Sequence, residues 1–309
     1  MAQGDAAVEG LSLRGAGARA VARLTRVSDP DPFDPASASA SPLLVALDVD
    51  GTIVHHDGYL APRVLEAVRT LAALPHVTVM IATGRSVLST LPVMAQLGLS
   101  TAGRPAVCSN GAVTISAAPD VAEGYELVDM VTFDPAPAIA LVHTHLPSAL
   151  VAVEEIGVGF KVSTPFPPGE LWGEERVVPV EELSARPATR VTFREPTLSS
   201  ADFTALVERI GLHGVSYAVG YSAWLDLAPE GVSKASALEL VRRRLGVEPH
   251  RTVAIGDQRN DLEMLHWAAV GYAMGQAPEE VIRAADRTTG AVEEDGLADA
   301  IDEVLAELA

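Results

Sequence analysis

The sequence predicts an α/β protein: a Rossmann-like, doubly wound parallel sheet core with an inserted α+β domain. The prediction rests on an alternation that begins at residue 43, where short apolar runs bounded by turns alternate with segments of helical periodicity. This alternation is typical of βαβ units, whose strands are parallel. It stops near residue 113 and resumes after residue 222. We therefore expect a core of residues 42–112 and 223–309, interrupted by a domain of residues 113–222.

The core segments can be assigned one by one. LLVAL is apolar throughout and VTVMIA is apolar except for Thr78, as expected of strands that are buried on both faces of a parallel sheet. The expected strands are residues 43–47, 77–82, 105–109 and 252–256. The expected helices are residues 62–74, 86–99, 234–246, 261–269, 278–285 and 296–308.

The inserted segment and the N-terminal segment have different patterns. Residues 113–222 combine alternating stretches, Pro/Gly-rich loops and two helix-like pieces at 135–146 and 199–211, which favours a separate α+β domain. Residues 1–41 are rich in Ala, Gly, Ser, Asp and Pro, and we expect a disordered leader. They lack the apolar region of a secretory signal, although an arginine-bearing amphipathic stretch at 11–27 leaves a targeting segment as an alternative.

The charge of the chain limits its partners. In 309 residues, 41 acidic side chains against 22 lysines and arginines give a formal net charge of −19. Such a charge repels polyanions, so we expect neither a nucleic acid nor an anionic membrane surface as a partner. No apolar run approaches the length of a membrane span. The single cysteine, Cys108, excludes a disulfide framework and favours a cytoplasmic location.

Polar residues interrupt the apolar pattern at places where a strand or a helix meets a loop. They are Asp48 and Asp50 after the first strand, Thr83, Gly84 and Arg85 after the second, Asp257, Asn260 and Asp261 after TVAIG, and Lys234 at the start of a helix. The carboxyl ends of parallel strands share one edge of the sheet, where ligands bind. Residues far apart in the sequence are therefore expected to converge there.

The residue types at this edge point to phosphate chemistry. Several carboxylates repel one another unless a cation lies among them, and an all-oxygen ligand set suits Mg²⁺. A lysine in the first turn of a helix is unfavourably placed unless an anion binds nearby. Asp48 could attack phosphorus to form an aspartyl-phosphate, while Asp50 could protonate the leaving alcohol and then activate water.

The motifs DVDGT (48–52), ATGR (82–85), a lone lysine and GDQRND (256–261), in that order, resemble the haloacid dehalogenase superfamily of phosphohydrolases. The insert begins after SNGA (109–112) and ends before PEGVSK (229–234), an arrangement similar to the Cof-type, class IIB phosphatases. The resemblance implies that the insert is a cap domain. It also implies a Mg²⁺-dependent phosphatase of a small phosphorylated metabolite, such as a sugar phosphate or a nucleotide or cofactor phosphate.

The resemblance also implies residue roles. Asp48 matches the nucleophile, and Asp50 matches the general acid and base, whose backbone carbonyl also binds the metal. Thr83 matches the phosphate-binding hydroxyl, Lys234 the neutralising lysine and Asp257 the acidic metal ligand. The predicted phosphate-binding residues are Thr83, Gly84, Lys234 and Asn260. The predicted metal ligands are Asp48, Asp50, Asp257 and Asp261, of which Asp261 matches a supporting position.

Several alternatives remain open from the sequence. A phosphomutase of the same architecture uses the same aspartyl-phosphate, a receiver-type phosphoacceptor combines similar residues, and a catalytically silent metabolite-binding protein would retain the site. Arg85 could bind phosphate or pair with an acid. Trp172, in the loop PFPPGELWG, could pack or contact the substrate, and His55 and His56 are expected to be loop residues. We expect a monomer or a homodimer.

Overall fold

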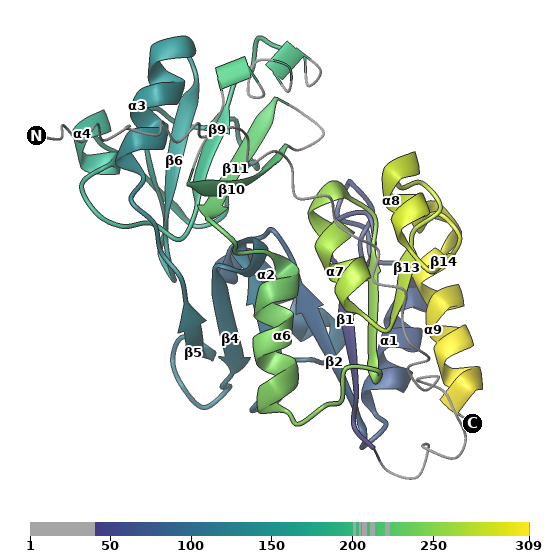
Figure 1. Cartoon of the computed structure of the whole chain (residues 1–309). Helices are drawn as coiled ribbons and strands as arrows, with labels where there is room; N and C mark the ends of the chain where they lie inside the picture. The colour runs from purple at the N-terminus through teal and green to yellow at the C-terminus, as the bar shows by residue number, and fades with distance from the viewer. Residues whose placement is uncertain are drawn as a thin grey trace, which may run out of the picture. The chain divides into compact units, whose positions relative to one another are not determined.

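Two sheets organise the part of the chain that the structure describes, a computed structural model of residues 41–199, 202–203, 205, 209–210, 214–219 and 223–308 (Figure 1). The predicted leader lies outside this part except for Ser41, as does most of the predicted helix at 199–211. Among the described residues, no helix combines the length and the apolar character that crossing a membrane would require.

The first sheet is the predicted core sheet. Its eight strands follow the order β14-β13-β12-β1-β2-β3-β4-β5. They are β1 (Leu43–Leu47), β2 (Val77–Ala82), β3 (Pro105–Cys108), β4 (Val113–Ala117), β5 (Tyr125–Met130), β12 (Thr252–Gly256), β13 (Val270–Ala273) and β14 (Arg287–Thr288). The pairs from β14 to β3 are parallel, whereas β4 and β5 extend the sheet as antiparallel strands.

Helices cover both faces of this sheet, which confirms the predicted doubly wound α/β core. The helical elements are α1 (Pro62–Ala72), α2 (Val87–Leu97), η1 (Ser109–Gly111), α6 (Lys234–Arg244), η2 (Arg259–Asp261), α7 (Leu262–Trp267), α8 (Glu279–Ala284), η3 (Val292–Glu294) and α9 (Gly296–Leu308). Leu43, Val45 and Leu47 of β1 pack with α1, α2 and α9. Leu44 and Ala46 point the other way and pack with α6, α7 and α8. The apolar run LLVAL therefore contributes side chains to the hydrophobic clusters on both faces of the sheet.

The second sheet lies in the inserted segment. Its strand order is β10-β11-β9-β6-β7-β8. The elements of this domain are α3 (Ala136–His145), β6 (Leu150–Glu155), β7 (Gly159–Val162), β8 (Glu174–Val177), α4 (Val180–Leu183), β9 (Val191–Arg194), β10 (Val215–Val219) and β11 (Trp224–Pro229). Side chains from α3, α4 and the strands β6, β9 and β11 form its main apolar cluster.

The range predicted for the insert, 113–222, divides between the two sheets. β4 and β5 pair with β3 in the first sheet, whereas β11, which begins at Trp224, belongs to the second. The alternating sequence of β4 resembles that of the insert because an antiparallel edge hairpin has the same period as any half-buried strand. We propose that the inserted domain begins after β5 and ends with β11.

The chain order of the strands creates a crevice next to β1. The chain runs outward from β1 through β2 to β3, and after the insert it returns on the other side of β1 through β12 and β13. Leu47 at the end of β1 is in register with Ile255 near the end of β12. In open α/β sheets, ligands bind at such a reversal of strand order. The loops that follow β1 and β12 therefore form the candidate site.

Candidate active site

Asp48 follows β1 directly and is held in the sheet by its backbone. Its N–H donates to the carbonyl oxygen of Ile255 at 3.0 Å, and the residue is only 5% exposed. Burial raises the pKa of Asp48 well above its usual value, and the carboxylate of Asp261 adds to this, against the opposing effect of Lys234. The strand thus delivers a carboxylate into a site where a nearby cation is needed to keep it charged.

Lys234 supplies one such cation. It is the first residue of α6, a helix capped by the side chain of Ser233, and it is fully buried. Its Nζ donates to Asp48 Oδ1 and to Asp261 Oδ1, both at 2.6 Å. Burial alone would lower the lysine's pKa, but the two carboxylates outweigh that effect and raise it. The structure thus shows two side-chain carboxylates at this lysine, whereas a bound anion at the start of the helix stays a prediction.

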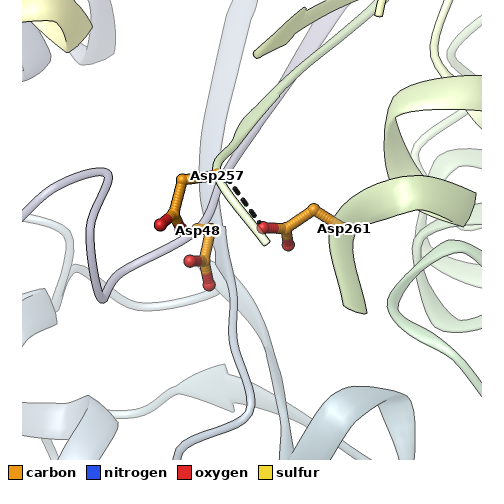
Figure 2. Close-up of side chains that lie close together, drawn as sticks. All are labelled: Asp48, Asp257 and Asp261. Carbon is orange, nitrogen blue, oxygen red and sulfur yellow. Dashed lines mark hydrogen bonds between the residues drawn. The ribbon is translucent and has the colours of Figure 1, made fainter. Parts of the chain in front are cut away.

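Asp257 and Asp261 follow β12. Asp261 Oδ2 accepts a hydrogen bond from the backbone N–H of Asp257 at 2.9 Å (Figure 2). It accepts a second from the backbone N–H of Gln258, also at 2.9 Å, so this carboxylate shapes the loop. Asp257 and Asp261 are both fully buried. Since Lys234 contacts the other oxygen of Asp261, the geometry favours a supporting role for Asp261.

Asp48, Asp257 and Asp261 form a compact acidic cluster. One oxygen from each lies within 4.8 Å of the others. Two of these buried carboxylates, those of Asp48 and Asp261, share the single positive charge of Lys234, so this pairing leaves an excess of negative charge. A hard divalent cation with oxygen ligands would remove this excess, and Mg²⁺ fits the donor set. The arrangement of these residues therefore suits the predicted metal.

The side chain of Asp50 lies apart from this cluster. Asp50 Oδ1 and Oδ2 accept from Arg85 Nη2 and Nε at 2.6 and 2.9 Å, and the Asp50 side chain is 52% exposed. Of the two alternatives for Arg85, the structure shows the ion pair. The carboxylate of Asp50 is thus not one of the clustered oxygens, and metal binding through its backbone carbonyl remains a proposal.

The predicted phosphate-binding residues follow β2. Thr83 is 1% exposed, and its Oγ1 accepts from the N–H of Arg85 at 3.1 Å, so its own proton is free to be donated elsewhere. A Cβ on Gly84 would lie 3.1 Å from Asn110 Oδ1, so a larger residue would crowd that side chain. Asn260 Nδ2 donates to the same Asn110 oxygen at 3.0 Å.

The sequence interpretation did not include Asn110 and Gln276. Asn110 lies in η1 with a φ of 53°, and it connects the loop after β2 with the loop after β12. Gln276 donates to the carbonyl oxygen of Gly51 at 2.6 Å and to Asp257 Oδ2 at 3.5 Å. Asn110 lies just after β3, and Gln276 lies just after β13. Both therefore have the position, next to the end of a core strand, that marked the other candidate site residues in the sequence.

A pocket of about 510 Å³ opens beside Asp50 and Arg85. Its lining includes His56 from the loop after β1, and Trp172 and Arg190 from the inserted domain. Of the two alternatives left open for Trp172, contact with a ligand is therefore compatible with its position in the pocket lining. His55 packs edge-on against the ring of Tyr59, with the centroids 5.2 Å apart.

Comparison with known proteins gives the family. Residues 45–135 and 179–301 match the model of a family described as haloacid dehalogenase-like hydrolase. A phosphoglycolate phosphatase of Natronomonas pharaonis is 31% identical over 260 residues, covering 84% of this chain and 96% of that protein. A 5-amino-6-(5-phospho-D-ribitylamino)uracil phosphatase of Bacillus subtilis is 26% identical over 278 residues, covering 83% and 95% of the two chains.

Solved structures share the fold. A haloacid dehalogenase-like hydrolase from Bacteroides thetaiotaomicron superposes with a TM-score of 0.70 at 21% identity, over 85% of this chain and all of that one. A subclass IIB sugar phosphatase of the same superfamily gives 0.69 at 22% identity, over 85% and 98%. The resemblance seen in the motifs is thus confirmed. The chain belongs to the haloacid dehalogenase-like hydrolase family, as a member of its phosphatase group.

Proposed function

We propose that the protein is a Mg²⁺-dependent phosphatase that hydrolyses a small phosphorylated metabolite through an aspartyl-phosphate on Asp48. The observation that carries this proposal is the convergence of Asp48, Asp257 and Lys234 at the end of β1. A carboxylate beside a lysine and a second acid has the chemistry of an activated oxygen nucleophile. When bound, the cation would neutralise the cluster and polarise a phosphoryl oxygen. Asp48, Asp257 and the backbone carbonyl of Asp50 would hold it.

In the first step, an oxygen of Asp48 attacks phosphorus. Lys234 engages Oδ1, so Oδ2 is the attacking atom in this scheme. A bond forms between Oδ2 and phosphorus, and the bond between phosphorus and the leaving oxygen breaks. Asp50 gives its proton to that oxygen, which leaves as the alcohol. The hydroxyl of Thr83 and the ammonium group of Lys234 stabilise the negative charge on the transferring group.

In the second step, Asp50 removes a proton from water, which attacks the same phosphorus atom. The bond between phosphorus and Oδ2 breaks, and the carboxylate of Asp48 is restored along with inorganic phosphate. For Asp50 to carry a proton, it must leave the ion pair with Arg85. An arriving phosphate dianion competes for the same guanidinium group and so provides a reason for that release.

The names of the relatives describe phosphatases of different phosphorylated metabolites, which supports a small-molecule substrate for this chain too. A cytoplasmic location is part of the proposal. The test is a panel of phosphorylated metabolites, with and without Mg²⁺, ranked by kcat/KM. Turnover should disappear with EDTA and return with Mg²⁺, and Mg²⁺ should also raise Tm because it binds the folded state. If no member of the panel is hydrolysed with Mg²⁺, the phosphatase proposal is wrong, and a catalytically silent metabolite-binding protein is favoured instead.

The phosphomutase remains the second candidate because it shares the aspartyl-phosphate. It differs in passing the phosphoryl group back to a sugar, so it requires a bisphosphate activator. A phosphatase releases inorganic phosphate in step with substrate loss, whereas a mutase produces an isomeric sugar phosphate. Product analysis by phosphorus NMR separates the two reactions.

A further inference from the structure

The loop between β7 and β8 forms one wall of the pocket beside Asp50 and holds Trp172 there. The loop is anchored at both ends. Phe166 is 5% exposed and packs edge-on against Trp224, with the ring centroids 6.0 Å apart. Gly173 has a φ of 100°, and a Cβ there would lie 2.7 Å from the carbonyl oxygen of Val158. The neighbouring Trp172 is 55% exposed and lines the pocket, so its ring is presented to a ligand by a fixed support.

The arginines of the pocket are already neutralised. Arg85 forms two hydrogen bonds with Asp50, at 2.6 and 2.9 Å. Arg190 forms two with Asp226, at 2.9 and 3.1 Å, and is only 7% exposed. No lysine is among the residues that line the pocket. The arginine side chains of the lining therefore offer no surplus positive charge beyond the guanidinium group of Arg85, to which the phosphoryl group itself would bind.

The acids of the pocket are not all neutralised. Glu170 is paired with Arg194 at 3.2 Å. Asp57 accepts a bond from the N–H of Tyr59 at 2.9 Å and forms no ion pair within the described part of the chain. A second anionic group on a ligand would meet this carboxylate without a compensating cation, and the chain's net charge of −19 adds to the repulsion.

We propose, building on the phosphatase function above, that this pocket selects monophosphates whose leaving group is uncharged and rich in hydroxyls. Trp172 supplies the flat apolar surface for that group, and Asp57 and Glu170 accept its hydroxyl hydrogens. Aromatic rings with a few placed polar groups are the usual lining of such pockets. The same charges make the pocket reject a leaving group that carries a carboxylate or a second phosphate.

The test compares substrates in pairs in which one member carries an additional carboxylate on its leaving group. The pairs are glucose 6-phosphate with 6-phosphogluconate, and glycerol 3-phosphate with 3-phosphoglycerate. Acetyl phosphate, whose leaving group is small, reports the basic chemistry. The wild-type enzyme with Mg²⁺ should favour the uncharged member of each pair by about tenfold or more in kcat/KM, as one unbalanced charge at close range implies.

Substitutions at two pocket residues, Asp57 and Trp172, each with a matched control outside the pocket lining, locate the effect. Asp57→Lys should reduce the preference for the uncharged substrate, whereas Asp120→Lys makes the same charge change at an exposed turn that is not part of the pocket lining and should not. Trp172→Ala should lower kcat/KM for glucose 6-phosphate by roughly threefold to tenfold, chiefly through KM, and Trp172→Phe should restore most of it. Val177→Ala, at an equally exposed site outside the pocket lining, is the control for Trp172.

The outcomes are distinct. If acetyl phosphate and the uncharged sugar or glycerol phosphates are all left intact, the proposed function is wrong. This inference, which depends on that function, is then wrong as well. Suppose instead that turnover is present but the charged and uncharged members of each pair react equally well. The inference alone is then overturned, and the same conclusion follows if Trp172→Ala matches Val177→Ala or if the two lysine variants behave alike.

Discussion

Lys234 Nζ lies 2.6 Å from Asp48 Oδ1, although 186 positions separate the two residues in the sequence. Neither group would be stable in this buried place alone, because an unpaired buried charge costs several kcal/mol. The pair therefore ties the start of α6 to the end of β1. It also leaves Oδ2 as the oxygen of Asp48 that Lys234 does not contact, which is the attacking atom in the proposed mechanism.

Replacing Asp48, the proposed nucleophile, tests the proposed mechanism. Asp48→Asn should reduce hydrolysis of 4-nitrophenyl phosphate by about four orders of magnitude or more, because an amide oxygen cannot form the acyl-phosphate. The fold should persist, since the amide fills nearly the same volume; circular dichroism checks this. A variant with wild-type turnover would exclude Asp48 as the nucleophile.

In the proposed mechanism Asp50 acts first as an acid and then as a base, and leaving groups of different basicity separate these two roles. With 4-nitrophenyl phosphate, whose leaving group needs little protonation, Asp50→Asn should still form the aspartyl-phosphate but hydrolyse it slowly. We expect a burst of 4-nitrophenol of about one equivalent, followed by slow turnover, in stopped-flow absorbance. With an alkyl phosphate, both steps should be slow. Unchanged steady-state turnover on the alkyl substrate would remove the acid and base roles from Asp50.

Removing Lys234 should weaken the fold as well as the activity. Lys234→Met leaves the buried carboxylates of Asp48 and Asp261 without their shared ammonium group, so the free energy of unfolding should fall by about 3–5 kcal/mol in a metal-free buffer. Urea denaturation measures this change. Lys161→Met is the comparison, because Lys161 also pairs with two carboxylates but at 3.3 and 3.6 Å and with 12% of its side chain exposed. Equal losses in the two variants would contradict the importance of the buried pair.

Gly51 has a steric role that a matched glycine can isolate. Its φ is 82°, and a Cβ would lie 2.3 Å from Asp257 Oδ2. Gly58 has nearly the same φ, 84°, with open space where its Cβ would be. Both Gly→Ala variants should lose the roughly 1 kcal/mol that a positive φ costs. Only Gly51→Ala should also displace Asp257, so it alone should weaken Mg²⁺ binding in isothermal titration calorimetry. Equal affinities in the two variants would refute this.

Glu154 makes stability depend on pH. It is 7% exposed, lies in β6 of the inserted domain, and accepts from Ser109 Oγ of η1 at 2.7 Å. Burial raises its pKa, against the opposing effects of Arg190 and Ser109. The folded protein therefore holds this proton to a higher pH than the unfolded chain, whose glutamate titrates near 4.5, and the ionised carboxylate costs stability above that pH.

Glu154→Gln should remove this dependence, because a glutamine does not titrate yet still accepts from Ser109. The Tm of the variant minus that of the wild type should be near zero below about pH 4.5 and grow as pH rises through the folded pKa of Glu154. Differential scanning calorimetry from pH 4 to pH 8 follows it. A Tm difference that is independent of pH, or that falls with rising pH, would contradict the assignment.

Much of the fold could be predicted because it depends on local pattern. The expected helix 296–308 is α9 with the same bounds, and the expected strands 43–47, 77–82 and 252–256 are β1, β2 and β12. The boundaries of the insert were harder to predict, since β4 and β5 join the core sheet by long-range pairing that their alternating sequence does not specify.

The sequence by itself determined the strand ends, and through them the chemical groups of the candidate site: Asp48, Thr83 and Asp257 each follow an apolar run. Only the tertiary structure decided their partners. Asp50 is turned to Arg85, Asp261 to Lys234 and to the backbone of its own loop, and Trp172 to the pocket beside Asp50. The reason is physical. Residue type and strand position are local properties, whereas ion pairing depends on which distant side chains folding brings within hydrogen-bonding distance.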